Sequence, residues 1–239
     1  MRKFAVFDID GTLIRWQLYH ILVDRLAKTN KLGPGVYDHI KEARMRWKKR
    51  ESADSYHAYE MEIVKGFESA LGRLTTQEFD EIIDSIIDEY KDQVYIFTRD
   101  LLKSLKSQGY FLLAISGSHH ELIEKIAKYY QFDDYKGSVY QRNEDSTGFN
   151  GNKYIASSNK ESALKEMVKQ HSLSLTDSYG IGDSKTDIPI LKMVDNPIAF
   201  NPNRLLYETA RTNNWKIVIE RKDMIYELEP STNSTYKLV

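Results

Sequence analysis

Short runs of apolar residues recur along the chain, separated by longer stretches in which apolar residues return at helical spacing. An apolar run that need not alternate with polar residues is typical of a strand buried on both faces of a parallel sheet. Such runs predict strands at residues 4–7, 111–115, 179–181, 198–200 and 217–219. The periodic stretches predict helices at residues 101–108, 120–130, 160–171, 188–194 and 205–213. Strands that alternate with helices indicate an α/β fold built on a doubly wound parallel sheet.

The interval between residues 15 and 95 departs from this alternation, because it holds no convincing strand. Apolar side chains recur there at helical spacing, at Tyr56, Tyr59, Ile63, Phe67 and Leu71 and again at Ile82, Ile83, Ile86, Ile87 and Tyr90. The residues Gly33-Pro34-Gly35 break the helical pattern. We therefore expect a small helical cap at 15–95, inserted after the first strand of a core at 1–14 and 96–229. Residues 140–152 are expected to form a hairpin or loop, and residues 230–239 a loose C-terminal tail.

Composition and charge narrow the class of protein. With 239 residues, 41% of them apolar and 29% charged, the chain suits one globular domain with a smaller insertion. Its net charge of −1 gives no overall attraction to nucleic acid or to an acidic membrane. The absence of cysteine excludes disulfides, thiolate metal sites and cysteine nucleophiles. No apolar run approaches the roughly 18 residues of a membrane helix or resembles a signal peptide, so we expect a cytoplasmic protein with no membrane partner.

The first predicted strand ends in Asp8-Ile9-Asp10-Gly11-Thr12. Alternate residues of an extended chain point the same way, so Asp8 and Asp10 leave the strand side by side. The carboxyl ends of strands are where ligands bind in open α/β sheets. A helix N-cap followed by a glycine turn would explain one of these aspartates but not both. Two carboxylates held close need a cation or a proton between them, which favours a catalytic interpretation.

Three further signals are weak when each is taken alone. Asp183 and Asp187 follow another apolar strand and can face one pocket, and hard carboxylate oxygens suit Mg²⁺, but Asp and Ser are also ordinary turn residues. Ser116 and Gly117 come after a strand and before a helix, where backbone N–H groups favour an anion, although Ser is a common N-cap. Lys160 is one lysine among many.

Together these residues resemble the four motifs of the haloacid dehalogenase-like hydrolases. Asp8-Ile9-Asp10-Gly11-Thr12, Ser116, Lys160 and Gly182-Asp183 with Asp187 match those motifs in order. The helical insertion after the first motif is similar to the cap of the phosphoserine phosphatase branch. The resemblance implies a Rossmann-like core and a Mg²⁺-dependent phosphatase that acts on a small phosphorylated metabolite.

The resemblance also implies a role for each motif residue. Asp8 would be the nucleophile that becomes an aspartyl-phosphate, and Asp10 would be the general acid and base. Ser116 and Lys160 would spread the charge of the transferring phosphoryl group. Asp8, Asp183 and the backbone carbonyl of Asp10 would hold Mg²⁺, with Asp187 either in the coordination shell or orienting Lys160. The substrate-binding positions would be Thr12, Gly117, Gln17 and Thr186.

Gln17 and Thr186 set this chain apart from phosphoserine phosphatases. Those enzymes carry Glu at the position of Gln17, where it pairs with the substrate amine, and often Asn at the position of Thr186. A neutral amide does not supply that charge, so phosphoserine is not the expected substrate. Two alternatives to hydrolysis stay open: transfer of the phosphoryl group to another hydroxyl, as in a phosphotransferase or mutase, and a non-catalytic phosphate-binding module.

Two other features allow more than one interpretation. The stretch from Lys41 to Arg50 holds six basic residues, one acid and Trp47. A solvated helix face is the expected reading, an electrostatic guide for an anionic substrate is a second, and nucleic acid is an unlikely partner. His119 and His120 are expected to be exposed in the first turn of a helix rather than to bind a metal, with the alternative that one of them lines the mouth of the pocket. The sequence does not indicate the oligomeric state.

Overall fold

The computed structural model describes residues 1–230 and 236–238. The described chain divides into two compact units. The first comprises Met1–Gln17, Glu89–Val139 and Tyr154–Val239, and the second comprises Leu18–Asp88 and Tyr140–Lys153. Each unit is described by itself.

A sheet with the strand order β4-β3-β2-β1-β5-β6-β7-β8-β9 runs through the first unit, and only the end of β3 and most of β4 belong to the second. The strands are β1 (Arg2–Phe7), β2 (Phe111–His119), β3 (Asp134–Arg142), β4 (Phe149–Tyr154), β5 (Leu173–Gly182), β6 (Asn196–Phe200), β7 (Lys216–Arg221), β8 (Met224–Pro230) and β9 (Tyr236–Leu238). All pairs from β3 to β7 are parallel, and β8 and β9 continue the sheet antiparallel. The doubly wound parallel sheet is therefore confirmed.

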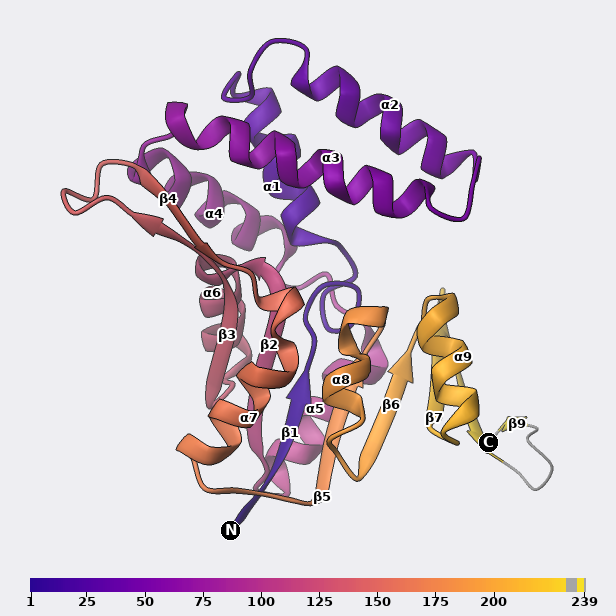
Figure 1. The fold of residues 1–239 in the computed structure, drawn as a ribbon. Coiled ribbons are helices and arrows are strands. Elements are labelled where there is room, and N and C mark those ends of the chain that lie inside the picture. The colour runs from indigo at the N-terminus through magenta and orange to yellow at the C-terminus, as the bar shows by residue number, and fades with distance from the viewer. Residues whose placement is uncertain (231–235, 239) are drawn as a thin grey trace. The chain divides into compact units, whose positions relative to one another are not determined.

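Helices cover both faces of this sheet. Figure 1 shows α7 (Lys160–Gln170), α8 (Ile188–Leu191) and α9 (Arg204–Thr212) on one face, and α5 (Ile96–Ser107) and α6 (His120–Tyr130) on the other. The 3₁₀ turns Ala156–Ser158 and Lys185–Asp187 precede α7 and α8. None of the described helices is both long and apolar enough to span a bilayer.

The two faces of β1 pack against different layers, as the unbroken apolar run predicts. Phe4 and Val6 lie in one buried cluster with Leu164 and Met167 of α7. On the opposite face the ring of Phe7 meets that of Phe132, with 5.8 Å between their centroids. A central strand buried on both sides gives the residues that follow it a rigid support.

The second unit holds four helices, α1 (Leu18–Lys28), α2 (Val36–Lys48), α3 (Ser55–Ala70) and the greater part of α4 (Thr76–Tyr90). Gly33-Pro34-Gly35 separates α1 from α2, as predicted. Gly66 allows α2 and α3 to approach closely, because a Cβ there would lie 2.6 Å from Cδ1 of Ile40. Phe67 contacts Tyr140 across 5.0 Å between ring centroids.

The structure corrects two of the expected boundaries. Residues 140–153 form the tip of a β3–β4 hairpin that packs with the helices of the second unit, so this unit is not one continuous insertion. Its aromatic residues explain the grouping, since Phe149 packs edge-on against Phe79 at 5.4 Å. Of the expected tail, residues 231–235 and 239 lie outside the described residues, but Tyr236–Leu238 form a strand paired with β8.

Burial predicts how two leucines of the first unit contribute to stability. Leu164 is fully buried, whereas Leu175 in β5 is 44% exposed. Leu164→Ala should lower the free energy of unfolding by about 2–5 kcal/mol, because it removes packed methyl groups and leaves a cavity. Leu175→Ala, the matched control, should change it by no more than about 0.5 kcal/mol. Urea unfolding followed by circular dichroism measures both, and equal effects would contradict the assigned core.

Candidate active site

The chemically active side chains of the first unit meet at the carboxyl ends of three neighbouring strands. Asp8 follows β1, Ser116 lies in β2 and Asp183 follows β5. The strand order places β1 between β2 and β5. The strands β2 to β4 continue the sheet on one side of β1, and the strands β5 to β9 continue it on the other. Such a point, where the order reverses, is the usual ligand crevice of an open α/β sheet.

The turn after β1 brings Asp8 and Asp183 close together. The amide of Asp8 donates to the carbonyl of Ile181 at 2.9 Å, which ties the end of β1 to β5. Gly11 has φ of +80°, and a Cβ there would lie 2.3 Å from Oδ2 of Asp183. Glycine is required at this position both for its left-handed backbone and for the space that Asp183 occupies.

Among the described residues, Lys160 is the cation that pairs with Asp8 and Asp187 at this centre. It is the first residue of α7, and only 3% of it is exposed. Its ammonium donates to Oδ1 of Asp8 at 2.6 Å and to Oδ1 of Asp187 at 2.5 Å. Burial alone would lower the pKa of Lys160, but the charges of Asp187 and Asp8 outweigh it and raise the pKa. The lysine is therefore held in its charged form.

Asp187 is fixed through both of its carboxylate oxygens. While Oδ1 accepts from Lys160, Oδ2 accepts from the amides of Asp183 at 3.1 Å and Ser184 at 2.9 Å. Gly182 makes room for it, since a Cβ there would lie 2.4 Å from Cβ of Asp187. These contacts fit the role of orienting Lys160, and Asp187 also offers an oxygen to the acidic cluster described below.

Asp10 and Ser116 form a second hydrogen-bonded pair. The hydroxyl of Ser116 donates to Oδ2 of Asp10 at 2.5 Å and accepts from the amide of Ser118 at 3.1 Å. Thr12 donates to Oδ2 of Asp8 at 3.2 Å. Gly117 approaches Ser157, whose Cβ would lie 3.0 Å from an added Cβ. Each of the two aspartates thus accepts a hydrogen bond from a hydroxyl group.

The balance of charge at this centre is negative. Asp8, Asp183 and Asp187 each offer an oxygen, and these oxygens lie within 4.8 Å of one another. Burial, together with the charges of Asp187 and Asp10, raises the pKa of Asp8 to about 7 against the opposing effect of Lys160. Burial, followed by the charges of Asp8 and Asp187, also raises the pKa of Asp183 well above its usual range. A set of hard oxygen donors that repel one another fits a divalent cation such as Mg²⁺.

The remaining predicted positions fall beside this centre. The amide of Gln17 lies against Gly11, with Nε2 at 3.0 Å from where a Cβ would stand. The hydroxyl of Thr186 shares a 2.8 Å hydrogen bond with that of Ser184. Ser184 was not singled out from the sequence, yet with Asp187 it forms a capping box that fixes the turn. The spacing Ser184-x-x-Asp187, with an acid three residues after a serine, is the sequence pattern that could have predicted this capping box.

The expectation of two exposed histidines was wrong. β2 extends as far as His119, so this side chain is only 1% exposed, and burial lowers its pKa to about 3. His120 begins α6 half-buried and packs beside Tyr135, with 5.4 Å between ring centroids. His119 is buried because β2 continues beyond the apolar run at 111–115, whereas the sequence pattern assigned both histidines to the surface of a helix.

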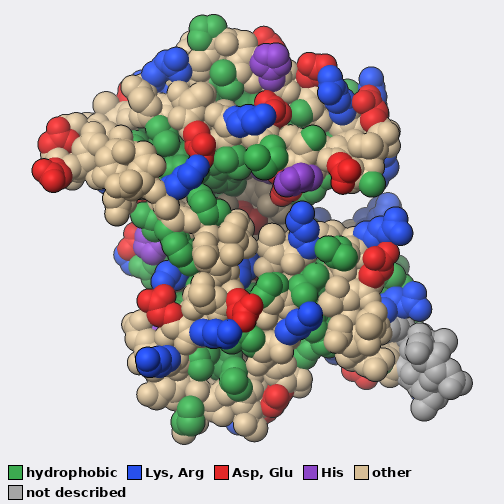
Figure 2. All heavy atoms as spheres, in the orientation of Figure 1, with side chains coloured by type: hydrophobic (Ala, Val, Ile, Leu, Met, Phe, Trp, Pro, Cys, Tyr) green, Lys and Arg blue, Asp and Glu red, His purple; other side chains and the backbone are tan. Residues whose placement is uncertain are grey.

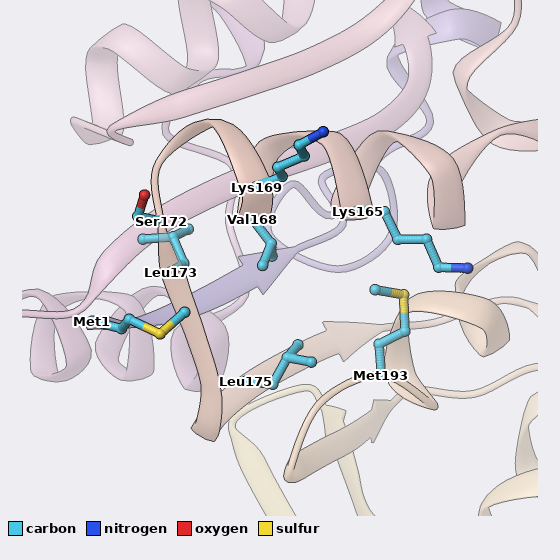
Figure 3. A pocket seen from close by; sticks show the side chains of 8 residues that line it. All are labelled: Met1, Lys165, Val168, Lys169, Ser172, Leu173, Leu175 and Met193. Carbon is cyan, nitrogen blue, oxygen red and sulfur yellow. The ribbon is translucent and has the colours of Figure 1, made fainter.

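An apolar groove of about 690 Å³ lies elsewhere on the first unit (Figure 3). Val168 and Lys169 come from α7, and Leu173 and Leu175 come from the start of β5. Met1 precedes β1. These are the amino ends of the central strands, whereas the aspartates follow the carboxyl ends, so the groove is not part of the candidate active site.

Comparison with known proteins identifies the family and the fold of the chain. The family model for haloacid dehalogenase-like hydrolases matches residues 5–192. A histidinol-phosphatase of Neisseria meningitidis is 25% identical over 91% of this chain and 99% of its own length. A phosphoserine phosphatase of Methanocaldococcus jannaschii is 23% identical over 93% of this chain and 94% of its own. The solved phospho-aspartyl intermediate analogue of a phosphoserine phosphatase has the same fold, with a TM-score of 0.63, 21% identity, and coverage of 93% and 95%.

The raised pKa of Asp8 predicts how pH affects stability in the absence of a divalent cation. Between the usual pKa near 3.8 and the folded value of about 7, the folded chain binds the extra proton. Stability should therefore fall as pH rises through this range, by at most about 1.4 kcal/mol per pH unit from this group. Asp8→Asn should remove that contribution. Urea unfolding in EDTA at several pH values would test this, and identical pH dependence in the two proteins would refute it.

Proposed function

Because the chain belongs to the haloacid dehalogenase-like hydrolase family, we propose that it is a Mg²⁺-dependent phosphatase that hydrolyses a small phosphomonoester through an aspartyl-phosphate on Asp8. The observation that carries the proposal is the buried Lys160, which bridges Asp8 and Asp187 at 2.6 and 2.5 Å. The phosphatase activities of the histidinol-phosphatase and phosphoserine phosphatase relatives support the same reaction class.

Asp8 is the group that attacks phosphorus. An oxygen of Asp8 forms the new bond to phosphorus as the bond to the leaving oxygen breaks. Lys160 already contacts Oδ1 of Asp8, so its ammonium lies where charge gathers on the transferring phosphoryl group. Asp8, Asp183 and the backbone carbonyl of Asp10 would hold the metal, which supplies positive charge that reduces the repulsion between the nucleophile and the phosphate.

Asp10 manages the protons in both half-reactions. It donates a proton to the leaving oxygen and then accepts one from the water that hydrolyses the aspartyl-phosphate. The hydroxyl of Ser116 holds Asp10 at 2.5 Å before the substrate binds. A hydroxyl has one hydrogen, so it must leave Asp10 to donate to a phosphoryl oxygen. That exchange releases Asp10 for its role as an acid when the phosphate is in place.

The nucleophile assignment is tested by Asp8→Asn. An amide of nearly the same shape is a poor nucleophile, so turnover of an aryl phosphate with Mg²⁺ should fall by at least about a thousand-fold. EDTA should abolish activity of the wild type, and Mg²⁺ should restore it. Asp177→Asn is the matched control, since Asp177 is a surface residue paired with Lys3. Retention of a large part of the rate by Asp8→Asn, or full activity without metal, would contradict the mechanism.

The surroundings of Gln17 predict the choice of substrate. Its neutral amide lies beside Gly11 and Asp183, where a carboxylate would be needed to pair with a substrate ammonium. Loss of one charge-assisted contact costs about 1.5–3 kcal/mol, so phosphoserine should be roughly 10–100-fold worse in kcat/KM than uncharged or acidic phosphomonoesters. Gln17→Glu should narrow that gap. If phosphoserine is the best of a panel of phosphorylated metabolites, the inference from Gln17 is wrong although the reaction class stands.

A further inference from the structure

The basic stretch at the end of α2 borders a pocket that the proposed chemistry does not use. The pocket has a volume of about 310 Å³ and is lined by Trp47, Arg50, Ser52, Ala53 and Tyr56. These residues belong to the end of α2, the connection to α3 and the first turn of α3, all within the second unit. Its size falls within the range of roughly 300–1,000 Å³ found for small-molecule sites.

An aromatic wall of the pocket is supported from behind. The ring of Trp47 is stacked on Tyr59, at 5.4 Å and an interplanar angle of 9°, and also meets Tyr56 at 5.0 Å. Arg44 holds Tyr59 by a hydrogen bond of 3.1 Å to its hydroxyl and is itself paired with Asp24 at 2.5 Å. Because these contacts fix the indole ring before any ligand arrives, little ordering is needed for a planar ring to stack there.

The cations of this stretch fall into two groups. Lys41, Arg44 and Arg46 pair with Asp38, Asp24 and Glu42 respectively. Within the described part of the chain, Lys48, Lys49 and Arg50 form no ion pair. The paired cations stabilise α2 and its support, whereas Arg50, which lines the pocket, is available to an anion there.

Arg50 occupies a position where glycine is the usual residue. Its φ is 54°, and its amide donates to the carbonyl of Trp47 at 2.8 Å while that of Glu51 donates to Arg46 at 3.2 Å. These two bonds form the Schellman motif that ends α2, with Arg50 at the left-handed position. The side chain of Arg50 is therefore not needed for the turn.

We propose that this pocket binds a phosphorylated aromatic ligand of the nucleotide class, with the base against Trp47 and Tyr56 and the phosphate on Arg50. Stacking on aromatic rings accepts any base, and an arginine fork matches a phosphate. Figure 2 shows acidic and basic side chains interspersed over the visible face of α2 and α3, not a continuous basic track. This pattern favours a single nucleotide over a long nucleic-acid strand.

Binding is tested in the full-length Asp8→Asn protein, so that turnover does not consume the ligand. Adenosine 5′-monophosphate should bind saturably in titration calorimetry and more tightly than adenosine or ribose 5-phosphate, which each lack one half of the ligand. Adding Arg50→Gly should weaken binding by about ten-fold or more, because it removes a charge-assisted contact. The melting temperature should stay the same or rise, since glycine suits the left-handed turn.

Arg46→Ala is the matched control. It removes the same charge from the same helix, but Arg46 pairs with Glu42 and does not line the pocket. It should leave the affinity unchanged, and Trp47→Leu should weaken it in a correctly folded protein. A single-stranded oligonucleotide that binds more tightly as it lengthens would identify nucleic acid as the source of the ligand. Absence of saturable binding of either probe at millimolar concentration, or equal losses in Arg50→Gly and Arg46→Ala, would overturn the proposal.

Discussion

The contact on which the candidate active site depends is the buried bridge from Lys160 to Asp8 and Asp187. An ammonium removed from water is tolerated only when it is paired and hydrogen-bonded, and the same holds for each carboxylate. The three partners come from the turn after β1, the start of α7 and the turn after β5, segments far apart in sequence. The parallel sheet brings them together, because β1 and β5 are neighbouring parallel strands whose carboxyl ends lie side by side. The fold and the site are thus linked through one triad of charges, and the glycines at 11 and 182 leave the space in which it forms.

The buried charges around Lys160 lower the stability of the protein, although the proposed function requires them. Burial raises the pKa of Asp8 and that of Asp183, and the neighbouring carboxylates, which one ammonium does not balance, add to the effect. A protein selected for stability alone would replace some of these charges with apolar residues. Their excess is useful only if a cation and an anionic substrate join the site. The excess of negative charge therefore indicates that a cation is expected at the site, and this argument does not depend on the sequence motifs.

The sequence predicted the elements whose signal is local. The apolar runs that form β1, β2 and β5 and the turn residues after them were identified, because buried parallel strands need no partner to be recognised. The hairpin tip at 140–153 was assigned to the wrong unit, since its grouping depends on contacts of Phe149 and Tyr140 with helices distant in sequence. β8 was missed because it is largely exposed and polar residues interrupt its apolar run. His119 was misjudged for a related reason: the end of β2 is set by pairing with β3, which the residues of β2 do not encode.

The sequence left two questions open, the role of Asp187 and that of the basic stretch from Lys41 to Arg50. The hydrogen-bond and ion-pair partners in the structure bear on both. Asp187 had two possible roles, and the contacts of its oxygens fit that of orienting Lys160. The stretch from Lys41 to Arg50 had three possible interpretations, which differ only in whether its charges are already satisfied. Some of its cations pair with acids on α1 and α2, while those at the helix end do not. A count of charges cannot separate these groups, because pairing depends on where side chains from neighbouring turns and helices lie. An unpaired cation beside an aromatic wall, such as Arg50 beside Trp47, can form a new ion pair with a ligand without breaking an existing one.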